Sequence, residues 1–218
     1  MSAMTDAFAR ALAAMDKQAF QSLYGRWEPL TPAEVAGLLS SAEIQWWIAG
    51  GRAARVGATD REHSDTDVVV RIGDLAALRE RLSDWDLWEA NSGALRPLLP
   101  GDDLSEGCEQ LWARRDADHP WQLDLPFDFS GDEWSFKHDR SIRVPWDRAL
   151  HTVDGVSYLR PELALLHKAH LDRAKDRADL AAARLEPGAR AWLAQTLDAL
   201  GHQTWAQAVL TPGGRWPE

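Results

Sequence analysis

The chain has 218 residues, 45% hydrophobic and 27% charged, a composition that excludes a disordered or fibrous protein. Asp and Glu outnumber Lys and Arg by 34 to 24. The resulting net charge of −10 argues against a general nucleic-acid-binding protein, which needs a basic surface to displace counterions. Cys108 is the single cysteine, which excludes an internal disulfide and a cysteine-rich zinc site.

No apolar run approaches the roughly 18 residues that a membrane helix requires, and the first residues lack the apolar core of a signal peptide. We therefore expect a cytoplasmic protein. Tryptophan is unusually frequent, with 12 residues against 2 tyrosines and 5 phenylalanines. Most indoles are expected in the core, and some could line a cavity, since their faces form flat walls that attract cations.

Residues 1–43 are expected to form a helical N-terminal extension, because apolar side chains recur at helical spacing over 8–23. Within this extension, Thr31 has the sequence context of a helix N-cap. Pro32 follows at the first helical position, and Glu34 is the expected capping-box partner. A helix is therefore predicted from Pro32.

Residues 44–145 are expected to form a mixed α/β sheet layer. Apolar and β-branched runs predict strands at 44–49, 67–72, 85–88, 110–114, 121–127 and 133–137. A short helix capped by Asp74 is expected after the second strand. Residues 95–109 are rich in Pro, Gly and Asp and predict a loop. Residues 130–132, Ser-Gly-Asp, predict a hairpin turn between the last two strands.

Residues 146–218 are expected to be a helical C-terminal region. The spacing predicts a helix from Pro161, a second one around 179–183 after a break near Lys175, and another after the Pro-Gly pair at 187–188. The predicted class is therefore α+β, a mixed β-sheet flanked by helices with helical segments at both ends.

The sequence feature with the clearest chemistry is Gly50-Gly51 followed by Asp65-Thr66-Asp67. The glycines end a predicted strand, and their missing side chains let backbone N–H groups approach an anion closely. A short helix is expected after them, and a helix N-terminus favours phosphate. Residues two apart on a strand point to the same face, so the two carboxylates are expected side by side.

Two carboxylates beside a phosphate cradle are what a Mg²⁺–nucleotide site requires, because Mg²⁺ prefers hard oxygen ligands and shares its shell with phosphates. The helix after the glycines is expected from about Arg52. A Gly-Gly pair alone is usually only a turn, and an Asp-x-Asp pair alone is usually a solvated turn. Their order, between two apolar strands, favours the functional interpretation. Two like charges at the start of an apolar strand are also unfavourable unless a cation neutralises them.

A third carboxylate is expected from the strand at 121–127. Alternation there puts Gln122, Asp124 and Asp128 on one face. Asp124 is the preferred candidate, because an aspartate in mid-strand is poorly favoured without a purpose, and Asp128, nearer the turn, is the alternative. The third acid could complete the metal site, act as general base toward an acceptor hydroxyl, or do both.

With these residues, the chain resembles the nucleotidyltransferase superfamily that shares the sheet of DNA polymerase β. Its signature is a hydrophobic strand, Gly-Gly or Gly-Ser, an Asp-x-Asp or Asp-x-Glu pair and a distant third acid. More narrowly, the chain is similar over about 44–210 to the aminoglycoside 2''-adenylyltransferase-like group, with lincosamide nucleotidyltransferases as close relatives. The blocks that carry the similarity are 47–51, 61–67, 121–123, 158–162, 165–169 and 175–179.

The resemblance implies a nucleotidyltransferase domain over 44–145 that needs Mg²⁺. Its donor is a nucleoside triphosphate, expected to be ATP, and its acceptor is a hydroxyl of a small molecule such as an aminoglycoside or lincosamide antibiotic. Pyrophosphate is released. On this resemblance Asp65 and Asp67 bind Mg²⁺, with Asp124 as the third acid. The residues that cradle phosphate are Gly50 and Gly51.

Four further residues are candidates for nucleotide binding, each with an alternative. Relatives usually carry a Trp and an acid where this chain has Arg52 and Arg55, so Arg52 could bind triphosphate or could mark a changed acceptor or a lost activity. His63 could touch phosphate or hold the loop. Lys168 could reach the triphosphate, or it could snorkel or be salt-bridged. Lys175 is a candidate only through the resemblance.

Two other functions stay open. The acceptor could be a protein or an RNA end, as in nucleotidyltransferases of toxin–antitoxin systems, although the acidic charge weighs against RNA. The departures at Arg52 and Arg55 would also fit a catalytically degenerate nucleotide-binding protein. The family resemblance does not determine the acceptor.

Overall fold

The computed structural model describes residues 22–40, 43–58, 63–91, 93–211 and 216. Most of the helix expected over 8–23 lies outside these residues. The described residues belong to two compact units, each made of two stretches of chain. The first unit holds the residues up to Trp46 and Ser64–Phe129, and the second holds Trp47–His63 and the residues from Ser130 onward.

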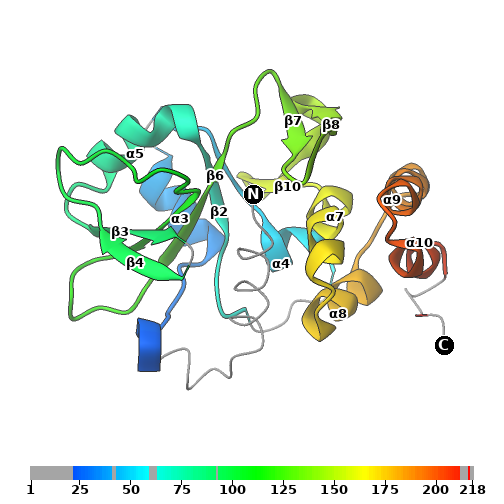
Figure 1. The fold of residues 1–218 in the computed structure, drawn as a ribbon, viewed down its shortest axis with the longest axis horizontal. Helices are drawn as coiled ribbons and strands as arrows, with labels where there is room; N and C mark the ends of the chain where they lie inside the picture. The colour runs from blue at the N-terminus through cyan, green and yellow to red at the C-terminus, as the bar shows by residue number, and fades with distance from the viewer. Residues whose placement is uncertain (1–21, 41–42, 59–62, 92, 212–215, 217–218) are drawn as a thin grey trace. The chain divides into compact units, whose positions relative to one another are not determined.

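The strands of the first unit lie in the order β4-β3-β5-β6-β2. Strands β2 and β6 are parallel, and the other neighbours are antiparallel. Figure 1 shows α3 and α5 with these strands. The bounds are α3 Pro32–Leu39, β2 Val68–Arg71, α5 Leu75–Arg81, β3 Asp86–Asn91, β4 Ala94–Pro97, β5 Gln110–Arg114 and β6 Leu123–Asp128, with a 3₁₀ turn at Ile72–Asp74.

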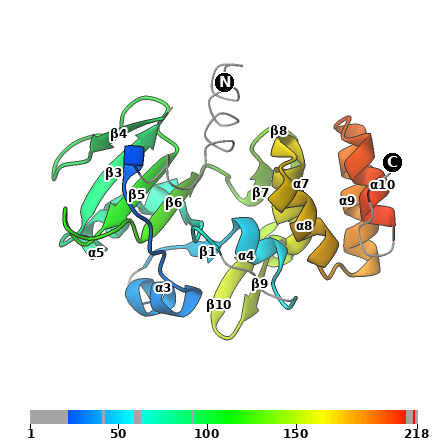
Figure 2. The same cartoon turned by 90° about the horizontal axis from the view of Figure 1, so that it is seen from below.

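In the second unit, β1 pairs in parallel with β10, which pairs antiparallel with β9. A separate hairpin joins β7 to β8. Helix α7 contacts α4, α8 and α9, and Figures 1 and 2 both show α9 alongside α10. The bounds are β1 Trp46–Ile48, α4 Gly50–Ala54, β7 Glu133–Phe136, β8 Asp139–Pro145, α6 Trp146–Ala149, β9 Leu150–Val153, β10 Val156–Leu159, α7 Pro161–Leu171, α8 Ala174–Ala182, α9 Pro187–Ala199 and α10 Gln203–Leu210.

Both units combine helices with parallel and antiparallel strands, which confirms the predicted α+β class and mixed sheet. All of the predicted strands are present with bounds shifted by a few residues. No helix in the described part of the chain is long and apolar enough to cross a membrane. The expected domain limits at 43 and 145 stay a prediction.

The capping box predicted at the start of α3 is confirmed. The Thr31 hydroxyl accepts a hydrogen bond from the Glu34 backbone N–H at 3.3 Å, and the Glu34 carboxylate accepts one from the Thr31 N–H at 2.8 Å. Two N–H groups at the helix start are thereby satisfied, so this helix is specified by its own sequence.

The hairpin predicted at 130–132 is wrong. Strand β6 has β5 on one side and β2 on the other, so β7 cannot pair with it and pairs with the next strand, β8. The loop predicted at 95–109 is wrong at its start. Residues 95–97 belong to strand β4, which pairs with β3. Strand β8 was not predicted, because none of its residues is buried and only Ile142 and Val144 supply apolar alternation.

Two helix limits also differ from the predictions. Helix α4 begins at Gly50, not near Arg52, and Gly50 has φ +58°, a left-handed conformation that favours glycine. The break after α7 lies at Asp172, which has φ +47°, and Lys175 is inside α8. The Asp172 carboxylate accepts hydrogen bonds from Arg177 at 2.7 and 2.6 Å, which helps to hold this turn.

The cap predicted for α5 is also wrong. Asp74 precedes the helix, but its side chain does not accept from the helix N–H groups. Its carboxylate accepts instead from the Gln45 N–H at 2.8 Å, a long-range contact that local sequence patterns do not report.

A buried carboxylate organises the β3–β4 end of the first unit. Glu89, only 1% exposed, accepts two hydrogen bonds from the Arg96 guanidinium at 2.9 Å. It also accepts from the backbone N–H and hydroxyl of Ser105, at 2.7 and 2.5 Å. The Arg96 hydrogen bonds outweigh burial and hold the pKa of Glu89 low, at about 2. Glu89 therefore ties the segment 96–105 to β3.

We expect Glu89→Gln to lower the free energy of unfolding by about 2 kcal/mol, because the Arg96 and Ser105 donors lose their charged acceptor. Since the pKa of Glu89 is lowered from 4.5 to about 2, its contribution is complete above pH 4.5 and is lost as the pH falls toward 2. Urea denaturation across this range measures both effects. Asp86→Asn is the control, since Asp86 is 40% exposed beside Arg114, and an equal loss in both variants would contradict the expectation.

Candidate functional site

The parallel pairing of β2 with β6 brings the predicted acids of the first unit together. Val70 lies opposite Phe127 in this register, and three residues earlier Asp67 forms a parallel bridge with Asp124. Asp65 precedes Asp67 by two positions on the same extended segment. Asp65 and Asp67 are half-buried while Thr66 between them is buried, which is the alternation expected of a strand.

Burial and like charge act together on Asp124. Asp124 is buried, with 9% of its surface exposed. Burial, and then the negative charges of Asp67 and Asp65, raise the pKa of Asp124 well above its usual 3.8. The Gln110 side-chain amide donates a hydrogen bond to one Asp124 oxygen and opposes this shift. These carboxylates are therefore close enough to repel one another, and a bound cation would relieve that repulsion.

The structure also distinguishes the two candidates for the third acid. Asp128 lies opposite Arg71 in the β2–β6 register, and its carboxylate is 4.0 Å from the Arg71 guanidinium Nε. Its charge is thus already offset by an arginine. Asp124 lies beside the other two acids instead, so the geometry favours Asp124.

The donor set fits Mg²⁺ in its chemistry. In the described part of the chain, no three His, Cys, Asp or Glu side chains are arranged to hold a metal ion. Mg²⁺ is usually bound by one or two carboxylates together with substrate phosphates and water. Asp67 and Asp124, with Asp65 next to them, offer only carboxylate oxygens, and they match a cation that binds together with a phosphorylated substrate.

Two indoles continue the row of side chains that ends at Asp124. Trp112 lies directly opposite Asp124 across the β5–β6 pair, and Trp88 lies opposite Trp112 across β3–β5. Directly opposite residues share a face of the sheet, so an aromatic surface adjoins the carboxylates. The ring of Trp27 meets Trp112 edge-on at 5.0 Å between centroids. Sequence alternation alone could not identify these tryptophans, because the strand register decides which residues lie opposite Asp124.

The predicted phosphate cradle belongs to the second unit. Gly50 and Gly51 open the five-residue helix α4, and Arg52 is half-buried within it. His63 is buried, at 9% exposure. Lys175 is exposed on α8. Phosphate binding by these residues stays a prediction.

Lys168 has buried partners within the second unit. Its ammonium group lies 3.0 Å from a carboxylate oxygen of Asp176 and 3.0 Å from one of Asp179, and both aspartates are fully buried. This is the ion-paired alternative that the sequence left open. The Arg173 guanidinium also contacts Asp176, at 2.7 Å, and Arg55 at the end of α4 lies 3.5 Å from Asp179. The cluster therefore joins α4, α7 and α8.

The charges of this cluster compensate one another. Burial disfavours ionised Asp176, but hydrogen bonds from Arg173 and the charge of Lys168 hold the pKa of Asp176 below its usual value. The sequence signal was weak, because two acids three positions apart at a helix start normally face solvent. Lys168, close to the buried Leu165 and Leu166 on its helix, was the better indication.

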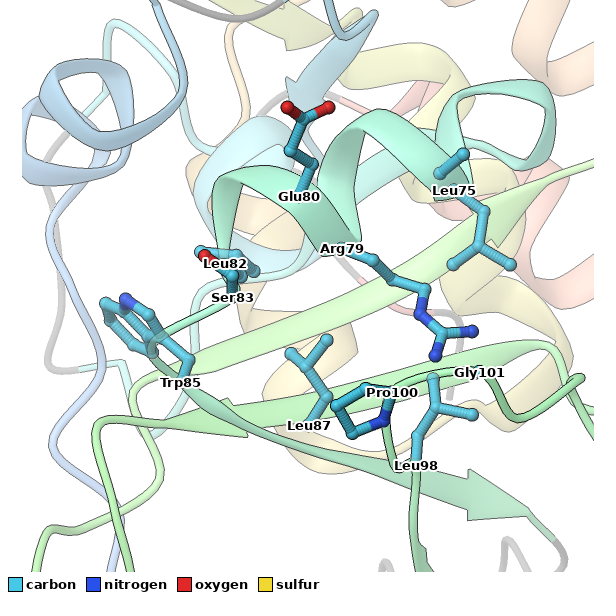
Figure 3. Close-up of a pocket in the computed structure, with 11 residues that line it drawn as sticks. Leu75, Arg79, Glu80, Leu82, Ser83, Trp85, Leu87, Leu98, Pro100 and Gly101 are labelled. Atoms are coloured by element: carbon cyan, nitrogen blue, oxygen red, sulfur yellow. The ribbon is translucent and has the colours of Figure 1, made fainter.

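A cavity of about 490 Å³ lies elsewhere in the first unit, between α5 and the segments that carry Leu87 and Leu98. Figure 3 shows Trp85 at one end of it and Arg79 near Leu98 at the other. Its lining is largely apolar, and none of the predicted site residues contributes to it.

No protein-family model matches this chain, and no curated protein matches it with significant similarity. The arrangement of the acids is therefore the basis on which a function is proposed.

We expect Asp124→Asn to stabilise the protein at pH 7 without divalent cations, because the neutral amide removes the repulsion from Asp67 and Asp65 while it keeps an acceptor for Gln110. The pKa of Asp124 is higher in the folded chain than its usual 3.8. The wild-type chain therefore loses stability as the pH rises from 3.8 through the raised pKa, because folding then requires a buried carboxylate to ionise. The variant should lose less stability over this pH range. A rise in melting temperature of about 2 °C or more is expected. Asp128→Asn is the control, which should be neutral or destabilising because it removes the partner of Arg71.

Lys168→Met should lower the free energy of unfolding by about 3–5 kcal/mol, because it leaves two buried carboxylates without their shared ammonium partner. The matched variant is Lys175→Met on the exposed surface of α8, expected to change stability by less than about 0.5 kcal/mol. Urea denaturation without nucleotide compares them. Similar small effects would contradict a structural role for Lys168.

Proposed function

We propose that this protein is a Mg²⁺-dependent nucleotidyltransferase. It moves a nucleoside monophosphate from a nucleoside triphosphate, expected to be ATP, to a hydroxyl of a small molecule. The observation that carries the proposal is the pairing of Asp67 with buried Asp124, with Asp65 beside them. Such a concentration of negative charge is unfavourable in the absence of a cation, and functional sites are where such groups gather.

The reaction is a substitution at the α-phosphorus. The acceptor oxygen forms a bond to this phosphorus, the bond to the bridging oxygen of the β-phosphate breaks, and pyrophosphate leaves. When bound, Mg²⁺ supplies charge neutralisation of the phosphate oxygens. Asp65 and Asp67 would hold the ion. Asp124, which lies beside Asp67 across the β2–β6 pair, would accept the hydroxyl proton.

The acceptor is proposed to be a small molecule. The net charge of −10 supports this over a nucleic acid, which an acidic surface repels. Trp112, which is half-buried opposite Asp124, places an indole next to the acids that part of a small molecule could contact. Aminoglycosides and lincosamides, which the family resemblance implies, are the first acceptors to test.

The test supplies the protein with Mg²⁺, α-labelled nucleoside triphosphates and a panel of hydroxylated compounds, and measures labelled product and pyrophosphate. We expect Asp67→Asn and Asp124→Asn to lower the rate by at least about 100-fold, the effect typical of a lost catalytic base or metal ligand. Asp128→Asn, four residues further along β6 than Asp124 and partnered by Arg71, should keep most of the activity.

Other outcomes decide between the alternatives. Label on a protein or an RNA would overturn the small-molecule acceptor and retain the chemistry. Absence of any Mg²⁺-dependent transfer or pyrophosphate release, across all four nucleotides and lysate as acceptor source, would overturn the enzymatic proposal.

A further inference from the structure

A short N-terminal segment runs along the acid-bearing part of the first unit. This strap, residues 24–30, pairs with the chain just before β6. The Trp121 N–H donates to the Arg26 carbonyl at 2.9 Å, and the Glu28 N–H donates to the Trp121 carbonyl at 2.9 Å. Leu30 continues the pattern, since its N–H donates to the Gln122 carbonyl at 3.0 Å. The strap is therefore held to the chain two residues before Asp124.

The other acid-bearing segment reaches the same residue of the strap through a side chain. The Thr66 hydroxyl donates a hydrogen bond to the Leu30 carbonyl at 2.8 Å. Thr66 is 1% exposed and lies between Asp65 and Asp67. Because side chains alternate along an extended chain, a Thr66 side chain directed to the strap leaves both carboxylates directed to the opposite face.

The two peptide groups of Leu30 thus connect the segments that carry the acids. One side of the residue binds the backbone at Gln122, and the other binds Thr66. Like charges on Asp65, Asp67 and Asp124 push these segments apart, and the bond between Thr66 and Leu30 opposes that separation. Valine would fill the same buried space if packing alone were required, so the hydroxyl is the informative group.

We propose that Thr66 is a positioning residue of the nucleotidyl-transfer site: through Leu30 it sets the separation of Asp65 and Asp67 from Asp124 and thereby the affinity for the divalent cation. This inference rests on the proposed function. Small displacements matter at such a site, since misplacing a reacting group by about 1 Å can cost roughly 100-fold in rate.

The test compares Thr66→Val, which removes the hydroxyl at constant shape, with Thr66→Ser, which keeps it. Mn²⁺ is the probe, with binding followed by electron paramagnetic resonance. We expect Thr66→Val to weaken Mn²⁺ binding by about 10-fold or more, as loss of an outer partner of a metal site typically does, and Thr66→Ser to restore it. In the transfer assay kcat should fall while the KM of the acceptor stays unchanged. Thr66→Cys, whose thiol is a weak donor, is a second variant should Thr66→Val fold poorly.

Tyr24→Phe is the matched control, because the Tyr24 hydroxyl donates to the Gly93 carbonyl at 3.0 Å at the far end of the strap. It should lose a similar amount of stability and keep Mn²⁺ affinity. Unchanged affinity in Thr66→Val, or an equal loss in Tyr24→Phe, would overturn the positioning role alone. Absence of Mn²⁺ binding and transfer in the unchanged chain would overturn the proposed function and this inference with it.

Discussion

Parallel pairing between β2 and β6 places Asp67 beside Asp124, and the proposed site depends on the repulsion between these two carboxylates. The pairing itself is favoured by apolar burial. Val68 and Val70 of β2, and Leu123 and Leu125 of β6, are all fully buried. Their burial draws the strands together, and the register that results leaves Asp67 beside Asp124. The hydrophobic effect is non-directional, so it cannot avoid this contact once the strands are in register.

The buried acids of the protein differ in whether a lysine or arginine side chain neutralises them. Glu89 is neutralised by Arg96 and the Ser105 donors. Asp176 and Asp179 share Lys168 and have arginines nearby. Among the described residues, Asp124 has an amide donor but no lysine or arginine in an ion pair. This contrast with Glu89, Asp176 and Asp179 supports the proposed cation site at Asp124.

Several of the tryptophans form an aromatic cluster in the first unit, close to Asp124 and to the strap. Trp88 and Trp112 share a face of the sheet with Asp124 through cross-strand pairing, and Trp27 of the strap packs on Trp112. Since Trp121 donates its indole N–H to the Tyr24 carbonyl at 2.6 Å, the aromatic cluster also anchors the strap. Trp112 thus contacts the strap through Trp27 and also lies beside the acids.

The sequence alone determined what depends on near neighbours. The α3 cap at Thr31, the β-branched run of β2 and the shared face of Asp65 and Asp67 follow from local spacing, since capping and strand alternation act over a few residues. Tertiary structure decided that Asp124 lies beside Asp67 while Asp128 lies beside Arg71. It also decided the carboxylate partners of Lys168, the pairing of β7 with β8 and the link from Thr66 to Leu30. Each of these joins groups whose contact depends on strand register or on burial between separate segments. No local pattern encodes such contacts, because the free energy that selects them comes from packing of the folded chain.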